Sequence, residues 1–223
     1  MQSADTALAT VDGYSFVCNA TGCPWDPLEV QCKAGLSVSF NIYHYRGLVN
    51  CGNLFLAPDL GALATDPTPF APNVQWPAAD SSKHYTLLML DPDAVLPGSW
   101  PFSAIGTLEP IRHMLVGNIA GDELTAGITA ADIAKAPYLL SPYQAPAPPS
   151  GSHRYGFFIF EQSEAKIAFK PLNNTDDTDT AGANGQRFSW DLPAFLTEYK
   201  LGSPVASNWM VVLTSPQGYT PVP

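Results

Sequence analysis

Two histidines stand at the beginnings of apolar runs that are predicted to be strands. His113 precedes one such run and His153 precedes another. Asp91 and Asp93 follow the end of a third run. Side chains alternate along a strand, so His153 and Tyr155 share one face. If the three strands are neighbours, these residues form one site, whose imidazoles and phenol can donate hydrogen bonds to phosphate or carboxylate oxygens. Asp91 would hold one imidazole in a single tautomer.

The same residues allow catalytic and purely structural interpretations. His113, His153 and Asp91 match the two-histidine, one-carboxylate ligand set of non-haem iron or zinc, so a metal-dependent enzyme is the alternative function. Hydrolysis with histidine as base lacks a nucleophile, because Ser152 points away from His153 on an extended chain and no G-x-S-x-G motif occurs. A histidine at a strand end is also often a capped or exposed residue without any ligand.

Apolar segments of strand length predict a protein built mainly of β-strands. Residues 36–44 alternate between apolar and polar side chains, which is typical of a half-buried strand. Residues 85–90 (YTLLML) are apolar on both faces, so we expect them in the middle of a sheet with both sides covered. The segments 114–119 and 155–160 have the same character, and 208–214 is the last predicted strand.

Only two short helices are predicted. The first spans residues 130–135, with Thr129 as its N-cap. The second begins after Ser189 or Asp191, takes a proline into its first turn and stops at Gly202.

Composition restricts the class of protein. The 223 residues include 20 acidic and 10 basic side chains, giving a net charge of −10, with 13% charged residues, 22 prolines and 17 glycines. The acidic balance argues against nucleic acid and against anionic membranes as partners. No segment has the length of a transmembrane helix. We expect a monomer with a single domain over residues 1–223, in which 1–68 carry the cysteines and 69–214 carry the motifs described below.

The cysteines predict an extracellular protein. All four lie in the first quarter of the chain without histidines at zinc spacing, so two disulfides are favoured, with three pairings open. Two N-x-T triplets agree with secretion. Residues 1–13 are too polar for a signal peptide, so we expect a mature secreted protein whose signal has been removed. The cysteines are Cys18, Cys23, Cys32 and Cys51, and the glycosylation candidates are Asn19 and Asn173.

We expect neither a metal nor a cofactor elsewhere in the chain. His44 stands beside tyrosines in a predicted strand, which favours packing over zinc binding. Asp176, Asp177 and Asp179 lie close together in the polar segment 173–185, but the EF-hand spacing is absent, so a solvated loop is favoured over a calcium loop.

Four motifs occur in an order that resembles the phosphatidylethanolamine-binding protein family. They are residues 90–95 (LDPDAV), 111–121 (IRHMLVGNIAG), 147–162 (APPSGSHRYGFFIFEQ) and 201–206 (LGSPVA). The resemblance covers residues 69–213, and the cysteine-bearing part lies before it.

The resemblance implies a large central antiparallel sheet packed on a smaller one, with short peripheral helices and a small anion pocket at the strand ends. It implies a non-enzymatic binding protein for phosphate or a phospholipid headgroup, with a protease as the favoured protein partner. The implied pocket residues are Asp91, Asp93, His113, Pro148, Pro149, His153 and Tyr155.

Three departures from the family pattern bear on ligand choice. Val95 stands where proline usually follows Asp-Pro-Asp-Ala. Ala145 and Ala147 replace the small residues, usually glycine, before Pro-Pro, and their methyl groups narrow the implied pocket. Trp209 and Met210 follow where aromatic residues usually line the mouth.

Overall fold

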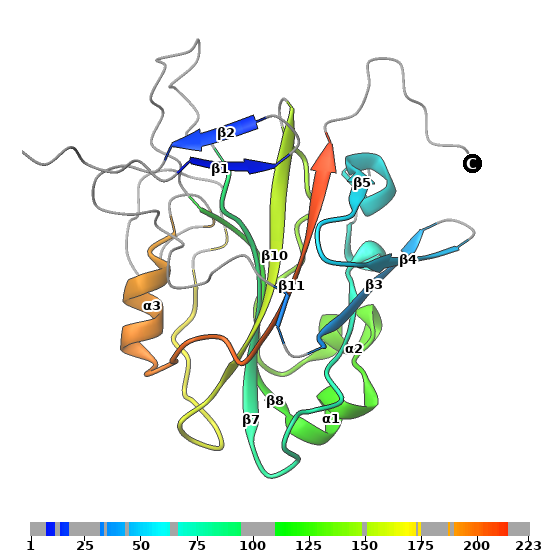
Figure 1. Cartoon of the computed structure of the whole chain (residues 1–223). Coiled ribbons are helices and arrows are strands. Elements are labelled where there is room, and N and C mark those ends of the chain that lie inside the picture. Colours follow the sequence, from blue (N-terminus) through cyan, green and yellow to red (C-terminus); the bar gives the residue numbers. More distant parts are fainter. Residues whose placement is uncertain are drawn as a thin grey trace, which may run out of the picture.

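A six-stranded β-sheet forms the centre of the computed structural model (Figure 1). Its order is β5-β11-β10-β7-β8-β9. The bounds are β5 (Leu54–Leu56), β7 (His84–Asp91), β8 (Ile111–Ala120), β9 (Leu139–Ser141), β10 (Ser152–Glu161) and β11 (Ala206–Leu213). The structure describes residues 8–11, 14–17, 32–33, 35–42, 45–62, 67–94, 110–148, 151–172, 174, 187 and 190–213.

A three-stranded sheet packs on one face of this central sheet, and a helix covers the other face (Figure 1). The smaller sheet has the order β4-β3-β6, and β1 pairs with β2 in a separate two-stranded sheet. The bounds are β1 (Leu8–Val11), β2 (Tyr14–Val17), β3 (Ser37–Ile42), β4 (Tyr45–Val49) and β6 (Asn73–Gln75). The predicted mainly-β fold, with a large sheet on a smaller one, is confirmed. The structure differs from the prediction at one edge of the central sheet, where β5 runs parallel to β11, and in the additional pair of β1 and β2.

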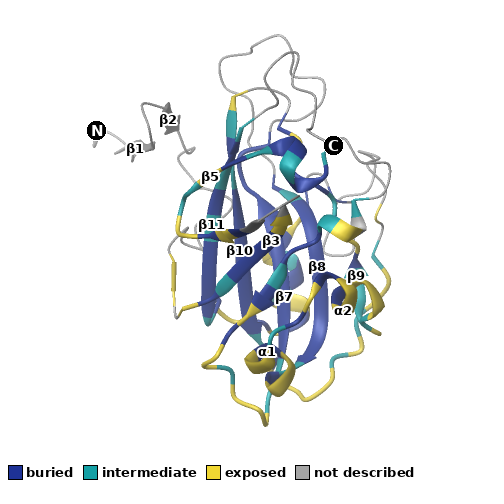
Figure 2. Ribbon diagram, turned by 90° about the vertical axis from the view of Figure 1, so that its right-hand side faces the viewer, coloured by how far each residue is buried: buried dark blue, intermediate teal, exposed yellow. Residues whose placement is uncertain are grey.

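Strand alternation divides the apolar side chains of the central sheet into two layers. Leu87 and Met89 of β7 pack with Phe40 of β3 in the larger layer, between the two sheets. Leu88 and Leu90 point the other way. The central strands are buried along almost their whole length (Figure 2). The prediction that residues 85–90 lie mid-sheet with both faces covered is therefore confirmed.

The helices match the prediction in part. Helix α2 (Ala130–Lys135) has the predicted bounds, and the Thr129 hydroxyl accepts a hydrogen bond from the Asp132 amide. Helix α3 (Leu192–Glu198) is capped by Asp191 but ends before Tyr199, earlier than expected. Helix α1 (Gly121–Ala126) was not predicted, and two 3-10 helices, η2 (Ala57–Leu60) and η3 (Thr68–Phe70), lie between β5 of the central sheet and β6 of the smaller sheet.

A β-bulge in β8 creates a buried polar cluster near the end of that strand. Asn118 has a φ of +53° at the bulge, where the pairing between β7 and β8 shifts by one residue. Its side chain donates to the Ile167 carbonyl (2.9 Å) and accepts from the Ile167 amide (2.8 Å). Gln162 donates to the Asn118 side chain (2.7 Å) and accepts from the Thr86 hydroxyl (3.0 Å). We call Thr86, Asn118 and Gln162 the closed cluster, since each of their buried side chains has its partners.

The cysteine-bearing segment is closed by a disulfide and is hydrogen-bonded to the last strand. A disulfide links Cys32 to Cys51. Asn208 of β11 accepts from the Cys51 amide (3.2 Å) and donates to the carbonyls of Leu36 (2.9 Å) and Val49 (3.1 Å). Segments that are far apart in sequence therefore meet at one buried side chain.

Candidate functional site

The strands that carry the predicted site residues are neighbours, in the order β10-β7-β8. Asp91 ends β7, His153 begins β10, and the Nδ1 atom of His153 lies 2.8 Å from the Asp91 Oδ2 atom. Both side chains are buried, with exposures of 2% for Asp91 and 8% for His153. The sequence-based expectation that Asp91 holds an imidazole therefore agrees with the arrangement of these two residues.

His113 enters the site from β8 and is held by the backbone of Gln144. The Nδ1 atom of His113 lies 2.8 Å from the Gln144 carbonyl oxygen, and the Gln144 amide donates to the His113 carbonyl (2.8 Å). The His113 ring meets Tyr155 edge to face, with centroids 5.0 Å apart. Its Nε2 atom is buried and has no hydrogen-bond partner among the residues that the structure describes. His113 thus contributes one unused polar atom to the site.

Asp93 is engaged on the other side of β10. Its carboxylate accepts from the Arg154 amide (2.9 Å), from Nε (2.8 Å) and from a terminal guanidinium nitrogen (2.6 Å). Its own amide donates to Asp91 Oδ1 (2.8 Å). Asp93 therefore orients Asp91 and neutralises Arg154, which alternation turns away from His153.

The pKa values of the two histidines are shifted in opposite directions. Burial lowers the pKa of His153, but the hydrogen bond to Asp91 and the charges of Asp91 and Asp93 outweigh burial, so the pKa lies above its ordinary value. Burial dominates at His113 and lowers its pKa. Burial also raises the pKa of Tyr155 well above its ordinary value, so the phenol stays protonated. These shifts favour the charged form of His153 and the neutral form of His113.

The remaining predicted residues are placed only in part. Pro148 is buried, directly before the segment that leads into β10. Pro149, Cys18, Cys23, Asn19 and Asn173 lie outside the described residues. No sequence pattern singled out Gln144, because its contribution comes from its backbone and depends on how residues 142–148 return to β8.

Further groups behind the site were also missed. Arg187 donates to the backbone carbonyls of Arg112 (3.2 Å) and His113 (3.3 Å). Arg112 itself is fully buried, and burial together with the charge of Arg187 lowers its pKa to about 9.

Two of the three residues of the metal-dependent alternative are hydrogen-bonded to each other. The Nδ1 atom of His153 and the Oδ2 atom of Asp91 are bonded to each other. Within the described ranges, no three His, Cys, Asp or Glu side chains converge as metal ligands would. His44 and the three aspartates of the 173–185 segment lie outside these ranges.

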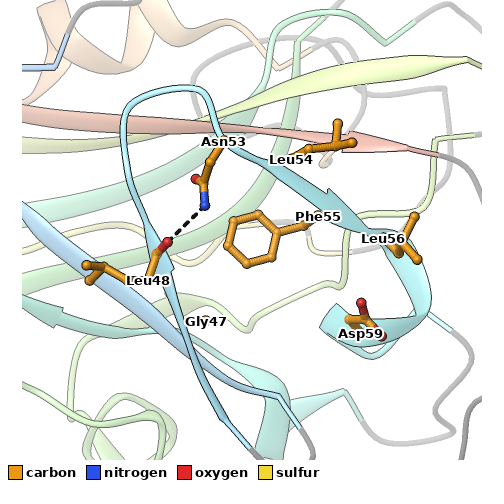
Figure 3. Close-up of a pocket in the computed structure, with 7 residues that line it drawn as sticks. All are labelled: Gly47, Leu48, Asn53, Leu54, Phe55, Leu56 and Asp59. Carbon is orange, nitrogen blue, oxygen red and sulfur yellow. Dashed lines mark hydrogen bonds between the residues drawn. The ribbon is translucent and has the colours of Figure 1, made fainter.

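A hollow of about 370 Å³ opens between strands β4 and β5, and none of the predicted site residues lines it. Figure 3 shows Phe55 pointing into it, with the Asn53 amide donating to the Leu48 carbonyl (3.0 Å) at one end. Among the described residues, Leu48 and Leu54 are the exposed large apolar side chains, at 54% and 57%. The hollow is lined by Gly47, Leu48, Asn53, Leu54, Phe55, Leu56 and Asp59.

Comparison with known proteins gives the class to which this fold and site belong. The family model of the phosphatidylethanolamine-binding proteins matches residues 56–209. The chain belongs to the phosphatidylethanolamine-binding protein family. The resemblance seen in the motifs is thereby confirmed.

Individual relatives agree with this membership. The chain is 33% identical over 161 residues to a 26 kDa secreted antigen of Toxocara canis. This match covers 72% of the chain and 50% of the antigen. The chain spans about half the length of the named relatives that it matches.

Solved structures share the fold. The phosphatidylethanolamine-binding protein of Plasmodium vivax is similar with a TM-score of 0.56 at 16% identity, over 85% of this chain and 92% of that one. The carboxypeptidase Y inhibitor, solved in complex with its cognate proteinase, is similar with a TM-score of 0.51 at 19% identity, over 82% and 85%. Within the part of the chain that the structure describes, no helix is long and apolar enough to cross a bilayer.

Proposed function

We propose that this protein is a non-enzymatic binding protein whose pocket at Asp91, His113, His153 and Tyr155 holds a phosphate group, either free or in a phospholipid headgroup. The observation that carries the proposal is the unused, buried Nε2 atom of His113 beside the His153–Asp91 pair. Buried polar atoms in native proteins are nearly always hydrogen-bonded, so an exception in a histidine cluster points to a ligand.

The local charges support an anion as that ligand. Asp93 pairs with Arg154, and the raised pKa of His153 favours its protonated form, which would balance the charge of Asp91. The Nε2 atom of His153 lies on the ring edge away from Asp91. In the protonated ring this atom can donate a hydrogen bond to an oxygen of the ligand. An anion there would form a charge-assisted hydrogen bond in a place with little water, where such bonds are strong.

Titration calorimetry with inorganic phosphate tests the proposal. We expect binding by the wild type, and a loss of at least about tenfold in affinity for His153→Gln, because a charge-assisted bond is removed. His84→Gln is the matched control, since the His84 Nδ1 atom is also buried without a partner among the described residues but lies at the opposite end of β7. Equal phosphate affinity in the wild type and His153→Gln would contradict a role of His153 in binding.

Secretion is the second part of the proposal. The likeness to a secreted antigen and the Cys32–Cys51 disulfide support it. With that pair formed, Cys18 and Cys23 are each other's remaining partners in the chain. Alkylation of the native protein without reduction is expected to label no cysteine, and labelling of two or more would contradict the extracellular assignment.

A protease stays the proposed protein partner. The fold likeness to the carboxypeptidase Y inhibitor supports this partner class. Inhibition of carboxypeptidase Y by the purified chain is the direct assay, and the His153→Gln variant shows whether the pocket takes part.

A further inference from the structure

The hydrogen-bond polarity of His113 follows from its backbone partner. Its Nδ1 atom lies 2.8 Å from the Gln144 carbonyl oxygen, and a carbonyl only accepts. Nδ1 therefore carries a hydrogen whether the ring is neutral or charged. In the neutral ring, Nε2 presents a lone pair, and this atom is buried without a partner. His113 therefore offers the ligand an acceptor, not a donor.

His153 has the opposite polarity. Its Nδ1 atom faces the carboxylate of Asp91 at 2.8 Å, so Nδ1 also carries a hydrogen. Asp91 and Asp93 stabilise the imidazolium form, in which Nε2 is a second donor. His153 and Tyr155 share one face of β10, and the Tyr155 ring touches His113. The two histidines thus present one cationic donor and one acceptor on the same side of the sheet.

We propose that the pocket selects a phosphate group that carries its own hydroxyl, with an anionic oxygen bound to His153 and the P–OH hydrogen donated to His113. Inorganic phosphate carries such a hydroxyl at neutral pH. Sulfate does not, and neither does the phosphodiester of a phospholipid headgroup. The inference rests on the proposed function and narrows its ligand to inorganic phosphate or a singly protonated phosphomonoester. A site built to pair with a hydroxyl discriminates strongly against analogues that lack it.

The charged groups around His113 keep it an acceptor at neutral pH. Burial lowers its pKa most, Asp91 and the Gln144 carbonyl raise it, and the cations of Arg187 and His153 lower it again, with a net lowering. Tyr155, the ring neighbour, remains a neutral phenol because burial raises its pKa. His113 gains a hydrogen at Nε2 only below its ordinary value of about 6.5. Acidification should therefore convert the acceptor to a donor and weaken the selectivity.

Calorimetry on the full chain with four probes tests the inference. The probes are inorganic phosphate, sulfate, dimethyl phosphate and glycerophosphoethanolamine. At pH 7.5 we expect phosphate to bind at least about tenfold more tightly than sulfate or dimethyl phosphate, because either would leave a buried acceptor unpaired. The phosphate-to-sulfate ratio should fall towards pH 5. Equal binding of phosphate and sulfate at pH 7.5 overturns the inference, as does tighter binding of glycerophosphoethanolamine, whose ammonium would then be the donor.

Two variants that replace an imidazole with a phenyl ring show which histidine distinguishes phosphate from sulfate. His113→Phe is expected to bring the phosphate-to-sulfate ratio close to one, whereas His153→Phe should weaken both anions by a similar factor and keep the ratio. An unchanged ratio in a folded His113→Phe protein overturns the inference. The wild-type ratio tests it without any variant. If no probe binds, the proposed function fails as well, whereas equal binding of all probes removes the inference alone.

Discussion

Two buried polar clusters lie at opposite ends of the same three strands, β8, β7 and β10. The closed cluster of Thr86, Asn118 and Gln162 has every side chain paired, including bonds to the backbone of Ile167. The cluster of Asp91, His113, His153 and Tyr155, which we call the open cluster, leaves one buried nitrogen without a partner. Both clusters are built from residues at strand ends, and both are shielded from solvent.

The difference between the clusters separates a structural role from a binding role. A buried polar network in which each group is paired rigidifies its surroundings, and removing any member leaves others unpaired. A network with an unpaired acceptor already includes the free-energy cost of a buried polar group without a partner. A ligand that pairs with this acceptor removes the cost. Loss of a member should therefore affect mainly stability in the closed cluster and mainly binding in the open cluster.

The largest effect on stability is expected for Gln162→Leu in the closed cluster. This change removes the acceptor of the Thr86 hydroxyl and the Asn118 amide and the donor to the Asn118 side chain. We expect the free energy of unfolding to fall by about 3–5 kcal/mol, since three buried groups lose their partner, with phosphate affinity unchanged. Urea denaturation and calorimetry measure the two quantities. Glu161→Gln, next in sequence and in a surface ion pair, is the control and should change stability by less than about 1 kcal/mol.

Asp91→Asn should have an intermediate effect on stability and a clear effect on binding. The amide cannot stabilise the His153 imidazolium as the carboxylate does, so the pKa of His153 should fall. We expect a loss of about 1–3 kcal/mol in the free energy of unfolding and at least about tenfold in phosphate affinity at pH 7.5. NMR titration of the imidazole checks the pKa directly. The exposed carboxylate of Glu164 provides a matched control in Glu164→Gln, and an unchanged His153 pKa in Asp91→Asn would sink the assignment.

The pH dependence of stability should be modest and traceable to His153. Its pKa is raised in the folded protein, so the folded state holds a proton more tightly than the unfolded chain. This stabilisation is fully present below about pH 6.5 and is lost as pH rises through the raised folded value. Urea denaturation across this range should show a decline in the wild type that is absent from His153→Gln. A parallel decline in both proteins would assign the effect to other groups.

The smallest effect on stability is expected for His113→Phe in the open cluster. The change removes one hydrogen bond to Gln144 and, at the same time, an unpaired buried nitrogen. These contributions oppose each other, so the free energy of unfolding should change by less than about 1 kcal/mol. A loss as large as that of Gln162→Leu would make the two clusters equivalent and remove the comparison.

Alternation along the strands was sufficient to predict much of the fold and part of the candidate site. The segment 85–90 indicated a central strand because both of its faces are apolar, and the structure pairs it on both sides. The positions of Asp91 and His153 at strand ends follow from the same pattern. Predicting the contact between these two side chains required, in addition, only that their strands be neighbours in the sheet.

Features that depend on backbone geometry could not be predicted in this way. The bulge at Asn118 and the support of His113 by the Gln144 carbonyl leave no periodic pattern in the sequence. Helix α1 begins at Gly121, where an added Cβ would lie 1.9 Å from the Asp80 carbonyl oxygen. Close packing requires a glycine at this position. Because glycine is a poor helix former, helix propensity does not predict that a helix begins there.

The parallel pairing of β5 with β11 has a consequence for the order of folding. Residues 54–56 pair with residues 211–213, and Asn208 binds the carbonyls of Leu36 and Val49, so both contacts span more than 150 positions of the chain. During synthesis this edge of the sheet stays open until the last strand has left the ribosome. Contacts of such long sequence separation slow folding and leave an unpaired strand edge exposed in the meantime. The Cys32–Cys51 disulfide closes a loop of only 19 positions and can form long before that edge is completed.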